Sequence, residues 1–277
     1  MHEWGHFFTA RKCGVKVLEF GLGMGKKLKG WMHNGVEYTI NAVPFGGFVR
    51  MLGEEEKSND PRSFEQAKLW KRMAITLAGI FMNLVAAVVA LTVLFSLGTK
   101  PILITEQDLQ QAQEAGILVL SEPNEEGVRE IVELKDVQKP FPASLGFALT
   151  ESWRISGAIV DKLAEIPGEV IRHRRLPEGM AGPVGIAEAT HQILPMGFFA
   201  ILKLWALLSL SLAVINLLPI PALDGGRFLF QLVELVLKPF RIRINARIEN
   251  AVHFGGYVLL MGLLVAVTWN DIVRVFF

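Results

Sequence analysis

Three long stretches without a charged residue divide the chain. Residues 73–98 form the first, and residues 204–223 and 251–270 form two more, the last with His253 as its one residue that titrates near neutral pH. A helix needs about 20 predominantly apolar residues to cross the hydrocarbon core of a membrane. Each stretch therefore predicts a transmembrane helix, and with flanking residues the expected spans are 73–98, 200–226 and 251–270.

Two shorter patterns precede the first span. Residues 2–13 predict a helix of about 18 Å, which is shorter than the ~30 Å hydrocarbon core. We therefore expect residues 1–13 to be a helix lying half in the membrane, or one truncated at its beginning. Residues 14–52 alternate polar and apolar positions between glycines, which predicts a small β-rich, membrane-associated element.

The remaining segments are more polar. Residues 53–72 predict a solvated cytoplasmic linker, and residues 227–250 predict a cytoplasmic loop. Residues 99–141 form an insert with an expected turn at 125–127, too small for an independent domain. Within residues 142–199, the stretch 145–175 is amphipathic, which fits an interfacial helix or, equally, a soluble helix packed on the preceding segment. The expected fold class is a mainly α polytopic integral membrane protein with a small β element after the first helix.

Composition supports this interpretation. The 277 residues are 51% hydrophobic and 20% charged, with a mean hydropathy of +0.38, as is typical of membrane proteins. A net charge of +1 without a separate basic domain argues against a nucleic-acid partner. A single cysteine, Cys13, excludes a disulfide within the chain. No signal peptide fits ahead of residue 2, so we expect insertion to depend on the later spans.

The distribution of basic residues predicts the topology. Residues 11–72 carry twelve Lys and Arg and residues 227–250 carry five, whereas the 101 residues from 99 to 199 carry nine. Basic residues are enriched on the cytoplasmic side, and two crossings separate the first two segments. Both are therefore expected on the cytoplasmic side, which brings the start of the chain and the end of the second span to the same membrane face.

Candidate chemistry begins with the first residues. His2, Glu3 and His6 spell H-E-x-x-H, and residues four apart on a helix share one face. Two imidazoles can then bind one zinc ion while the glutamate acts as general base. The alternative is a pair of ordinary surface histidines. Since His33, His173, His191 and His253 lack metal-ligand spacing, they are expected to be surface or packing residues.

Asp224 is the best candidate for a third ligand, because the predicted topology brings it to the membrane face of the two histidines. It ends an irregular sequence, Asn216-Leu-Leu-Pro-Ile-Pro-Ala-Leu-Asp-Gly-Gly226, and irregular backbone at membrane depth has to line a cavity or be buried in protein. The alternative is an ordinary helix end capped by Asp-Gly-Gly. Asn83, within the first span, is either an interhelical hydrogen-bonding residue or a functional one.

Several segments together resemble a known family. The sequence is similar to the site-2 proteases, which are intramembrane zinc metalloproteases, and within them to the bacterial regulator of sigma-E protease. The matching segments occur in the family's order: residues 2–7, 21–25, 43–51, 181–187 and 216–226.

This resemblance implies a zinc metalloendopeptidase of the bacterial inner membrane with its active site toward the cytoplasm. Its substrate would be a transmembrane protein, such as an anti-sigma factor or another membrane-anchored regulator, cut within its transmembrane segment. The family pattern assigns Zn²⁺ to His2, His6 and Asp224 and general-base catalysis to Glu3. It assigns substrate binding to Asn216 and Asn83 and to the β element, which can pair with an unwound substrate; the expected β residues are Pro44, Gly46, Gly47 and Phe48.

Two departures from the family pattern stand out. The family's Gly-Pro-x-x-Asn signature appears as Gly79-Ile-Phe-Met-Asn83, without its proline. Many relatives carry PDZ domains of about 80–100 residues between the second and third spans, and the 43-residue insert cannot hold one. Two other classes also remain open: a catalytically inactive scaffold that retains a metal site, and a metal-handling transporter, which lacks support from an inverted repeat of broken helices. Neither class needs Glu3.

Overall fold

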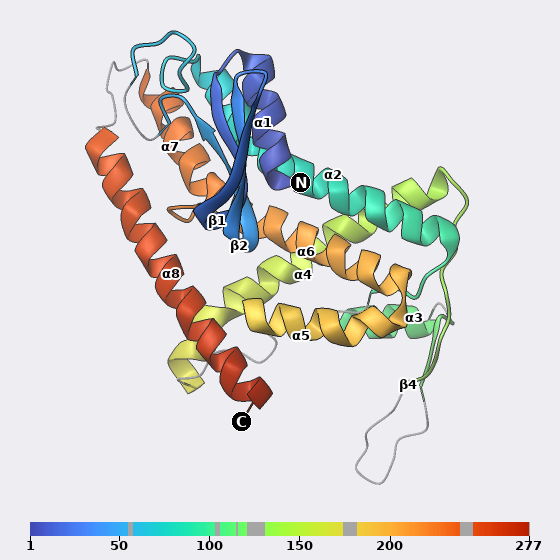
Figure 1. Ribbon diagram of the computed structural model, residues 1–277. Helices are drawn as coiled ribbons and strands as arrows, with labels where there is room; N and C mark the ends of the chain where they lie inside the picture. Colours follow the sequence, from blue (N-terminus) through green and yellow to red (C-terminus); the bar gives the residue numbers. More distant parts are fainter. Residues whose placement is uncertain are drawn as a thin grey trace. The chain divides into compact units, whose positions relative to one another are not determined.

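A computed structural model of the chain (Figure 1) describes residues 1–54, 58–102, 106–114, 116–120, 131–173, 182–238 and 246–276. The described residues are mainly helical with a small sheet after the first helix, which confirms the predicted fold class. The chain divides into two compact units, Met1–Asn83 with Ile215–Gly262 and Leu84–Val214 with Leu263–Phe277. The turn expected at 125–127 lies outside the described residues.

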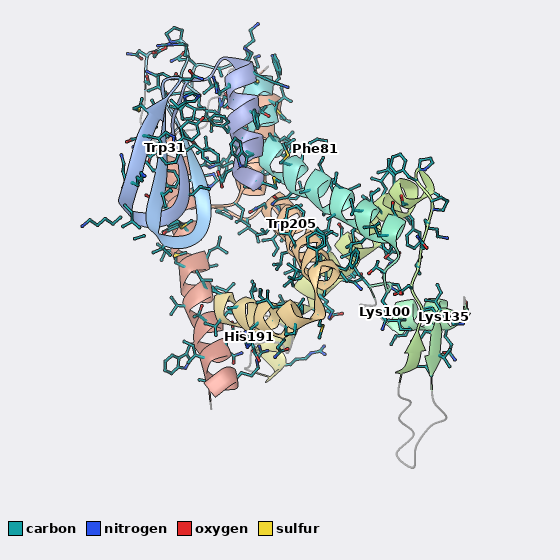
Figure 2. The ribbon with its side chains drawn as sticks, turned by 45° about the vertical axis from the view of Figure 1, so that its right-hand side comes forward. Trp31, Phe81, Lys100, Lys135, His191 and Trp205 are labelled. Atoms are coloured by element: carbon teal, nitrogen blue, oxygen red, sulfur yellow. The ribbon has the colours of Figure 1, made fainter. Side chains whose placement is uncertain are left out.

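Within the described part of the chain, three helices are long and apolar enough to span a membrane. They are α2 (Leu69–Leu97), α6 (Phe198–Leu217) and the segment Ala251–Arg274 within α8 (Ala246–Phe276). Large apolar side chains lie exposed along them, as for Phe81 on α2, which is 65% exposed and points away from the helix in Figure 2. In water such exposure would be unfavourable, so these faces suit contact with lipid.

The first unit begins with α1 (His2–Cys13), as predicted, followed by β1 (Val17–His33) and β2 (Val36–Met51). Its apolar core joins α1, both strands and α2 through eight buried residues: Phe7, Ala10, Val15, Val17, Phe20, Val36, Met51 and Ile75. Helices α1 and α2 approach each other closely at Gly5, since a Cβ there would lie 2.2 Å from the carbonyl oxygen of Ala78. A residue with a side chain would push the two helices apart.

The two long strands pair more than once because each bends back on itself. Residues 27–33 pair with 36–41 in a hairpin whose turn has positive φ at Asn34 and Gly35. Residues 19–22 pair both with 37–40 and with 47–50. Among the described residues, 47–50 pair with no other strand, so this segment leaves one edge open.

Two segments of the first unit differ from their predictions. The segment 53–72 is not simply a solvated linker, because Ser63 is fully buried and Phe64 packs against the core. The predicted loop 227–250 instead contains most of α7 (Asp224–Leu237). Few charges interrupt residues 224–237, and the helix buries Gln231, whose amide donates to the Thr76 hydroxyl at 3.0 Å.

The second unit contains the polar insert and the amphipathic region. The insert forms α3 (Glu106–Glu114) and a hairpin of β3 (Leu118–Leu120) and β4 (Ile131–Leu134). The amphipathic region forms α4 (Ala143–His173), α5 (Pro183–Ile193) and the short 3-10 helix η1 (Leu194–Met196). Of the predicted helix 145–175, residues 174–175 lie outside the described residues. Buried residues of α2, α4 and α6 form the core of this unit.

A buried carboxylate caps α5. Asp271 of α8 is fully buried and accepts a hydrogen bond of 2.8 Å from the backbone N–H of Gly185 in the first turn of α5. Gly182 precedes this turn, and a Cβ there would lie 2.9 Å from the carboxylate oxygen. Carboxylates are favourable at helix N-termini, where backbone N–H groups lack partners. Residues 182–185 thus form a closely fitting turn that binds the Asp271 carboxylate.

Candidate metal centre

His2 and His6 project from one face of α1, as their spacing predicts. Their Nε2 atoms are 3.1 Å apart, and the two rings meet edge to face with their centroids 4.7 Å apart. His6 is buried and His2 is partly buried. The two nitrogens therefore point toward one location.

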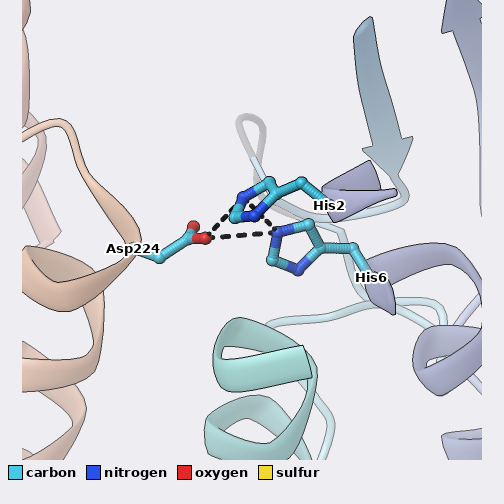
Figure 3. A group of neighbouring side chains, drawn as sticks. All are labelled: His2, His6 and Asp224. Atoms are coloured by element: carbon cyan, nitrogen blue, oxygen red, sulfur yellow. Dashed lines mark hydrogen bonds and ion pairs between the residues drawn. The ribbon is translucent and has the colours of Figure 1, made fainter. Parts of the chain in front are cut away.

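Asp224 brings a carboxylate to the same location (Figure 3). Its Oδ2 lies 2.9 Å from Nε2 of His2 and 3.2 Å from Nε2 of His6. The three ligand atoms all lie within 4.8 Å of one another, close enough to hold one metal ion. Two imidazoles and a carboxylate, with a fourth position left for water, are a usual ligand set of catalytic zinc.

An irregular loop positions Asp224. Helix α6 ends at Leu217 and α7 begins at Asp224, so Asp224 opens a helix, and the alternative that it caps the end of one is wrong. Within the loop, Ala222 has φ +76°, a left-handed conformation that costs a non-glycine residue about 1 kcal/mol. Gly225 packs tightly behind Asp224, since a Cβ there would lie 2.2 Å from the Leu218 carbonyl oxygen.

The contacts around the three side chains fit a metal ion. Nδ1 of His6 lies 2.8 Å from the carbonyl oxygen of Ile75, so the proton is on Nδ1 and the lone pair of Nε2 faces the cluster. Such a hydrogen bond is the usual outer partner of a metal-bound histidine. Oδ2 of Asp224 is buried, and its polar neighbours there are Nε2 of His2 and Nε2 of His6. A cation between these atoms would satisfy the carboxylate.

Glycine at position 79 makes room for the two rings. A Cβ on Gly79 of α2 would lie 2.3 Å from Nε2 of His6 and 2.7 Å from Cε1 of His2. These separations are far below van der Waals contact, so a larger residue would displace both imidazoles. Helix α2 therefore forms a closely fitting wall of the candidate site.

Asn83 lies one helical turn beyond Gly79 on α2. It is 3% exposed, and its amide nitrogen is 3.5 Å from Nδ1 of His2. The structure thus places Asn83 beside an expected metal ligand, where its side chain can influence the orientation of the His2 ring.

Glu3 lies in a cavity of about 600 Å³ that also contains the three expected ligands. Burial raises the pKa of Glu3 above its ordinary value, although the nearby His6 and His2 oppose this effect. Charged and polar groups dominate the cavity wall, which includes the Arg50–Glu19 ion pair at 2.7 Å and an ion pair between Arg227 and Glu54. Such charged and polar groups bind water, so water can reach the candidate site through this cavity.

The ionisable groups of the cluster affect one another. Burial would lower the pKa of His6, but the adjacent Asp224 outweighs burial and raises it. Burial would raise the pKa of Asp224, but the imidazoles of His2 and His6 hold it well below its usual range. Since Asp224 is also in the first turn of α7, the positive end of the helix dipole favours its ionised form.

Comparison with known proteins identifies the family. The model of peptidase family M50 matches residues 1–263. The chain belongs to this family. Membership confirms the predicted resemblance to site-2 proteases and the predicted enzyme class, a metalloprotease.

Relatives of this M50 peptidase align along nearly its whole length. A candidate zinc metalloprotease of Clostridium perfringens is 31% identical, with 99% of this chain and 94% of the relative covered. A candidate zinc metalloprotease of Fusobacterium nucleatum is 27% identical over 100% of the chain and 95% of the relative. Zinc metalloprotease RasP of Bacillus licheniformis is 26% identical over 99% of the chain and 96% of the relative. All three descriptions include zinc, in agreement with the predicted cofactor.

The residues expected to bind substrate are spread more widely than the three expected metal ligands. Phe48 lines the cavity, and a Cβ on Gly47 would lie 3.4 Å from Cγ of Glu3. Gly46 has φ +74° and, like Asn216 near the end of α6, is absent from the described cavity wall. The side chain of Pro44 lies outside the described residues.

Sequence reasoning missed three features of the site. The close contacts of Gly5 and Gly79 depend on two helices meeting, although both glycines occur in motifs that were singled out. The Arg227–Glu54 pair joins residues 173 positions apart, so no local pattern predicts it. Glu54 begins a run of three glutamates, which is typical of a solvated linker and gives no sign of a distant partner.

Proposed function

We propose that this M50 peptidase is an intramembrane zinc metalloprotease that hydrolyses a peptide bond within the transmembrane segment of a membrane-anchored regulatory protein. The observation that carries the proposal is the convergence of His2, His6 and Asp224 in a polar cavity that also contains Glu3. The three candidate spans of the chain supply the membrane setting.

His2, His6 and Asp224 would hold the zinc ion, which supplies Lewis-acid chemistry that polarises the scissile carbonyl and lowers the pKa of water. Glu3 takes a proton from the attacking water and later delivers it to the amine of the leaving fragment. Its raised pKa suits this exchange, since a carboxylate with a higher pKa is a stronger base. The Ile75 carbonyl keeps the His6 ring in the orientation that ligation needs.

The β element supports the proposed substrate class. A transmembrane helix shields its peptide bonds by its own hydrogen bonds, so it has to unwind before hydrolysis. The segment 47–50 has an open edge among the described residues, and Gly47 lies against Glu3. A substrate added as a strand along this edge would expose one carbonyl next to the general base, with Phe48 in contact with its side chains.

The location of the enzyme follows from the basic-residue count. The segments 11–72 and 227–250 are the denser in Lys and Arg, so we place them and the active site on the cytoplasmic side of a bacterial inner membrane. From there the enzyme would act in regulated intramembrane proteolysis, and the released cytoplasmic fragment of an anti-sigma factor or similar regulator would carry the signal.

Glu3→Gln tests the proposal. The variant keeps the shape of the side chain but removes the base, so it should retain wild-type zinc while cleavage disappears. Zinc is measured by elemental analysis of the purified chain, and cleavage by immunoblotting of co-expressed, tagged single-span proteins. The matched control is Glu65→Gln, an exposed position, which should cleave normally. Unchanged cleavage by Glu3→Gln would exclude the proposed mechanism.

A further inference from the structure

His253 makes an unusual contact with the loop that carries Asp224. Its Nδ1 lies 3.0 Å from the backbone nitrogen of Ala222, two residues before Asp224, and accepts the hydrogen bond from that N–H. His253 comes from α8, 31 positions later in the sequence. The sequence pattern alone assigns it only to packing or the surface.

The backbone groups of the loop show why this acceptor matters. Leu218, Ile220 and Leu223 donate their N–H groups to carbonyls within residues 215–220, while the two prolines have none. Ala222 is therefore the one residue of 218–223 whose N–H finds its acceptor outside the neighbouring chain. An unpaired N–H in an apolar surrounding is costly, so His253 completes the hydrogen bonding of the loop.

The bonded residue is also the strained one. Ala222 has φ +76°, and a side-chain-bearing residue keeps this conformation only when its surroundings hold it there. A second residue of α8 helps, since a Cβ on Gly256 would lie 2.5 Å from both the Cβ and the carbonyl oxygen of Pro221. The close approach of α8 at Gly256 brings His253 within reach of Ala222.

The chemistry of the ring agrees with a specific role. Because Nδ1 accepts, the neutral ring carries its proton on Nε2, which is buried and has no hydrogen-bond partner among the described residues. A residue needed only for packing would be better apolar, since a buried donor without a partner is unfavourable. The hydrogen bond at Nδ1 offsets the cost of leaving Nε2 without a partner.

We propose that His253 is a positioning residue for the metal centre: it holds Ala222 in its left-handed conformation and thereby fixes the Asp224 carboxylate facing His2 and His6. This inference rests on the proposed function, because it requires Asp224 to be a zinc ligand. Outer partners of metal ligands typically contribute about 10–100-fold to metal affinity, and the effect here travels through the backbone of the loop.

Zinc affinity of the full chain in detergent micelles, measured by competition with a chelator, tests the proposal. His253→Ala should weaken zinc binding about tenfold and change the visible absorption spectrum of the Co²⁺-loaded protein. His253→Asn, which places an amide oxygen near the position of Nδ1, should restore both. Adding Ala222→Gly to His253→Ala should recover affinity to within about threefold of wild type, because glycine adopts positive φ without strain.

Two further variants serve as a control and as a replacement if His253→Ala does not fold. His191→Ala removes an exposed histidine of α5 (Figure 2) and should bind zinc normally. Should His253→Ala not fold, His253→Gln replaces it, since its amide reaches the position of Nε2 and should fail where His253→Asn succeeds. Wild-type affinity in His253→Ala, or equal losses in the Asn and Gln variants, would overturn the proposal.

Asp224→Ala separates this proposal from the proposed function. If that variant keeps its zinc, the ligand set itself is wrong and both proposals fall. If Asp224→Ala loses zinc while His253→Ala binds normally, the ligand set stands and the positioning role of His253 alone is wrong.

Discussion

The two segments that supply the candidate ligands are built in opposite ways. His2 and His6 sit on a regular helix, where a spacing of four residues is enough to place both rings together. Asp224 follows a loop with a left-handed alanine and two prolines, held by hydrogen bonds and close contacts from other elements. The first geometry is local, whereas the second depends on tertiary structure.

This difference determines which substitutions disturb the candidate site. The helical pair keeps its spacing wherever α1 is formed, and other elements act on it through what they place against the two rings, namely the Ile75 carbonyl, Gly79 and Asn83. The carboxylate keeps its position only while α6, α7 and α8 remain packed around the loop. We therefore expect changes far from the ligands to reach the site mainly through Asp224.

Removing the loop ligand should have the largest effect. Asp224→Ala deletes one of three ligands and leaves two imidazoles, so zinc binding should weaken at least about 100-fold, the upper end of what loss of an outer partner causes. Elemental analysis of the purified protein measures the loss, and cleavage should disappear with it. Asp60→Ala, in the polar segment 58–68, is the matched carboxylate control. Near-complete zinc occupancy of Asp224→Ala would place the third ligand elsewhere.

Intrusion on the helical pair should come next. In Gly79→Ala the new methyl group would overlap both imidazoles, so zinc affinity should fall about 10–100-fold even though alanine favours a helix by ~1 kcal/mol. The control is Gly157→Ala in α4, where a Cβ meets nothing within 4 Å and binding should be unchanged. Zinc binding by Gly79→Ala equal to that of the control would contradict the described packing.

The two kinds of ligand should also separate in their response to pH. A proton competes with zinc for a histidine nitrogen, and Asp224 raises the pKa of His6 in the metal-free protein. As the pH falls through this raised pKa, zinc affinity should drop, approaching about tenfold per pH unit for each displaced proton. Asp224 contributes nothing in this range, because its pKa is lowered and it stays ionised.

Chelator competition at several pH values between 8 and 5.5 measures this effect. In Asp224→Glu, where the longer side chain alters the contact with His6, the midpoint of the fall should shift. An affinity that does not change between pH 8 and 5.5 would show that His6 does not bind the metal.

The sequence predicted those parts of the fold that depend on local pattern. The spans, α1 and the β element follow from apolar stretches and alternation, and the helical spacing of His2 and His6 follows from their positions. The count of basic residues brings Asp224 to the membrane face of the two histidines, and the structure places it beside both. Its roles and those of the other site residues stay predictions.

What the sequence could not predict depends on contacts between distant segments. Residues 227–237 were expected to form a loop, because a short amphipathic helix between two spans lacks a distinctive pattern. The motif at 181–187 matches a family pattern, but its sequence alone predicts no role, because the contact of Gly185 with Asp271 joins α5 to the distant α8. Likewise, no local pattern predicts a role for His253, because its contact with Ala222 depends on the packing of α8 against the loop.

Removing the left-handed strain at Ala222 should have the smallest effect of these changes. Ala222→Gly relieves about 1 kcal/mol of left-handed strain, but it also gives the unfolded chain about 0.4–1 kcal/mol of additional freedom. The net free energy of unfolding should therefore change little, and zinc affinity should stay near wild type because His253 still holds the loop. Thermal unfolding and chelator competition measure the two quantities.

Ala222→Val is the counterpart of this variant, because a β-branched side chain is a genuine outlier at positive φ. It should weaken zinc binding although it touches no ligand, while Thr9→Val at a half-buried position of α1 should leave binding unchanged, since a helix tolerates this exchange. If both valine variants bind zinc equally well, the strain in the loop is irrelevant to the metal centre. If only Ala222→Val is impaired, the backbone conformation of the loop is itself a determinant of where the third ligand lies.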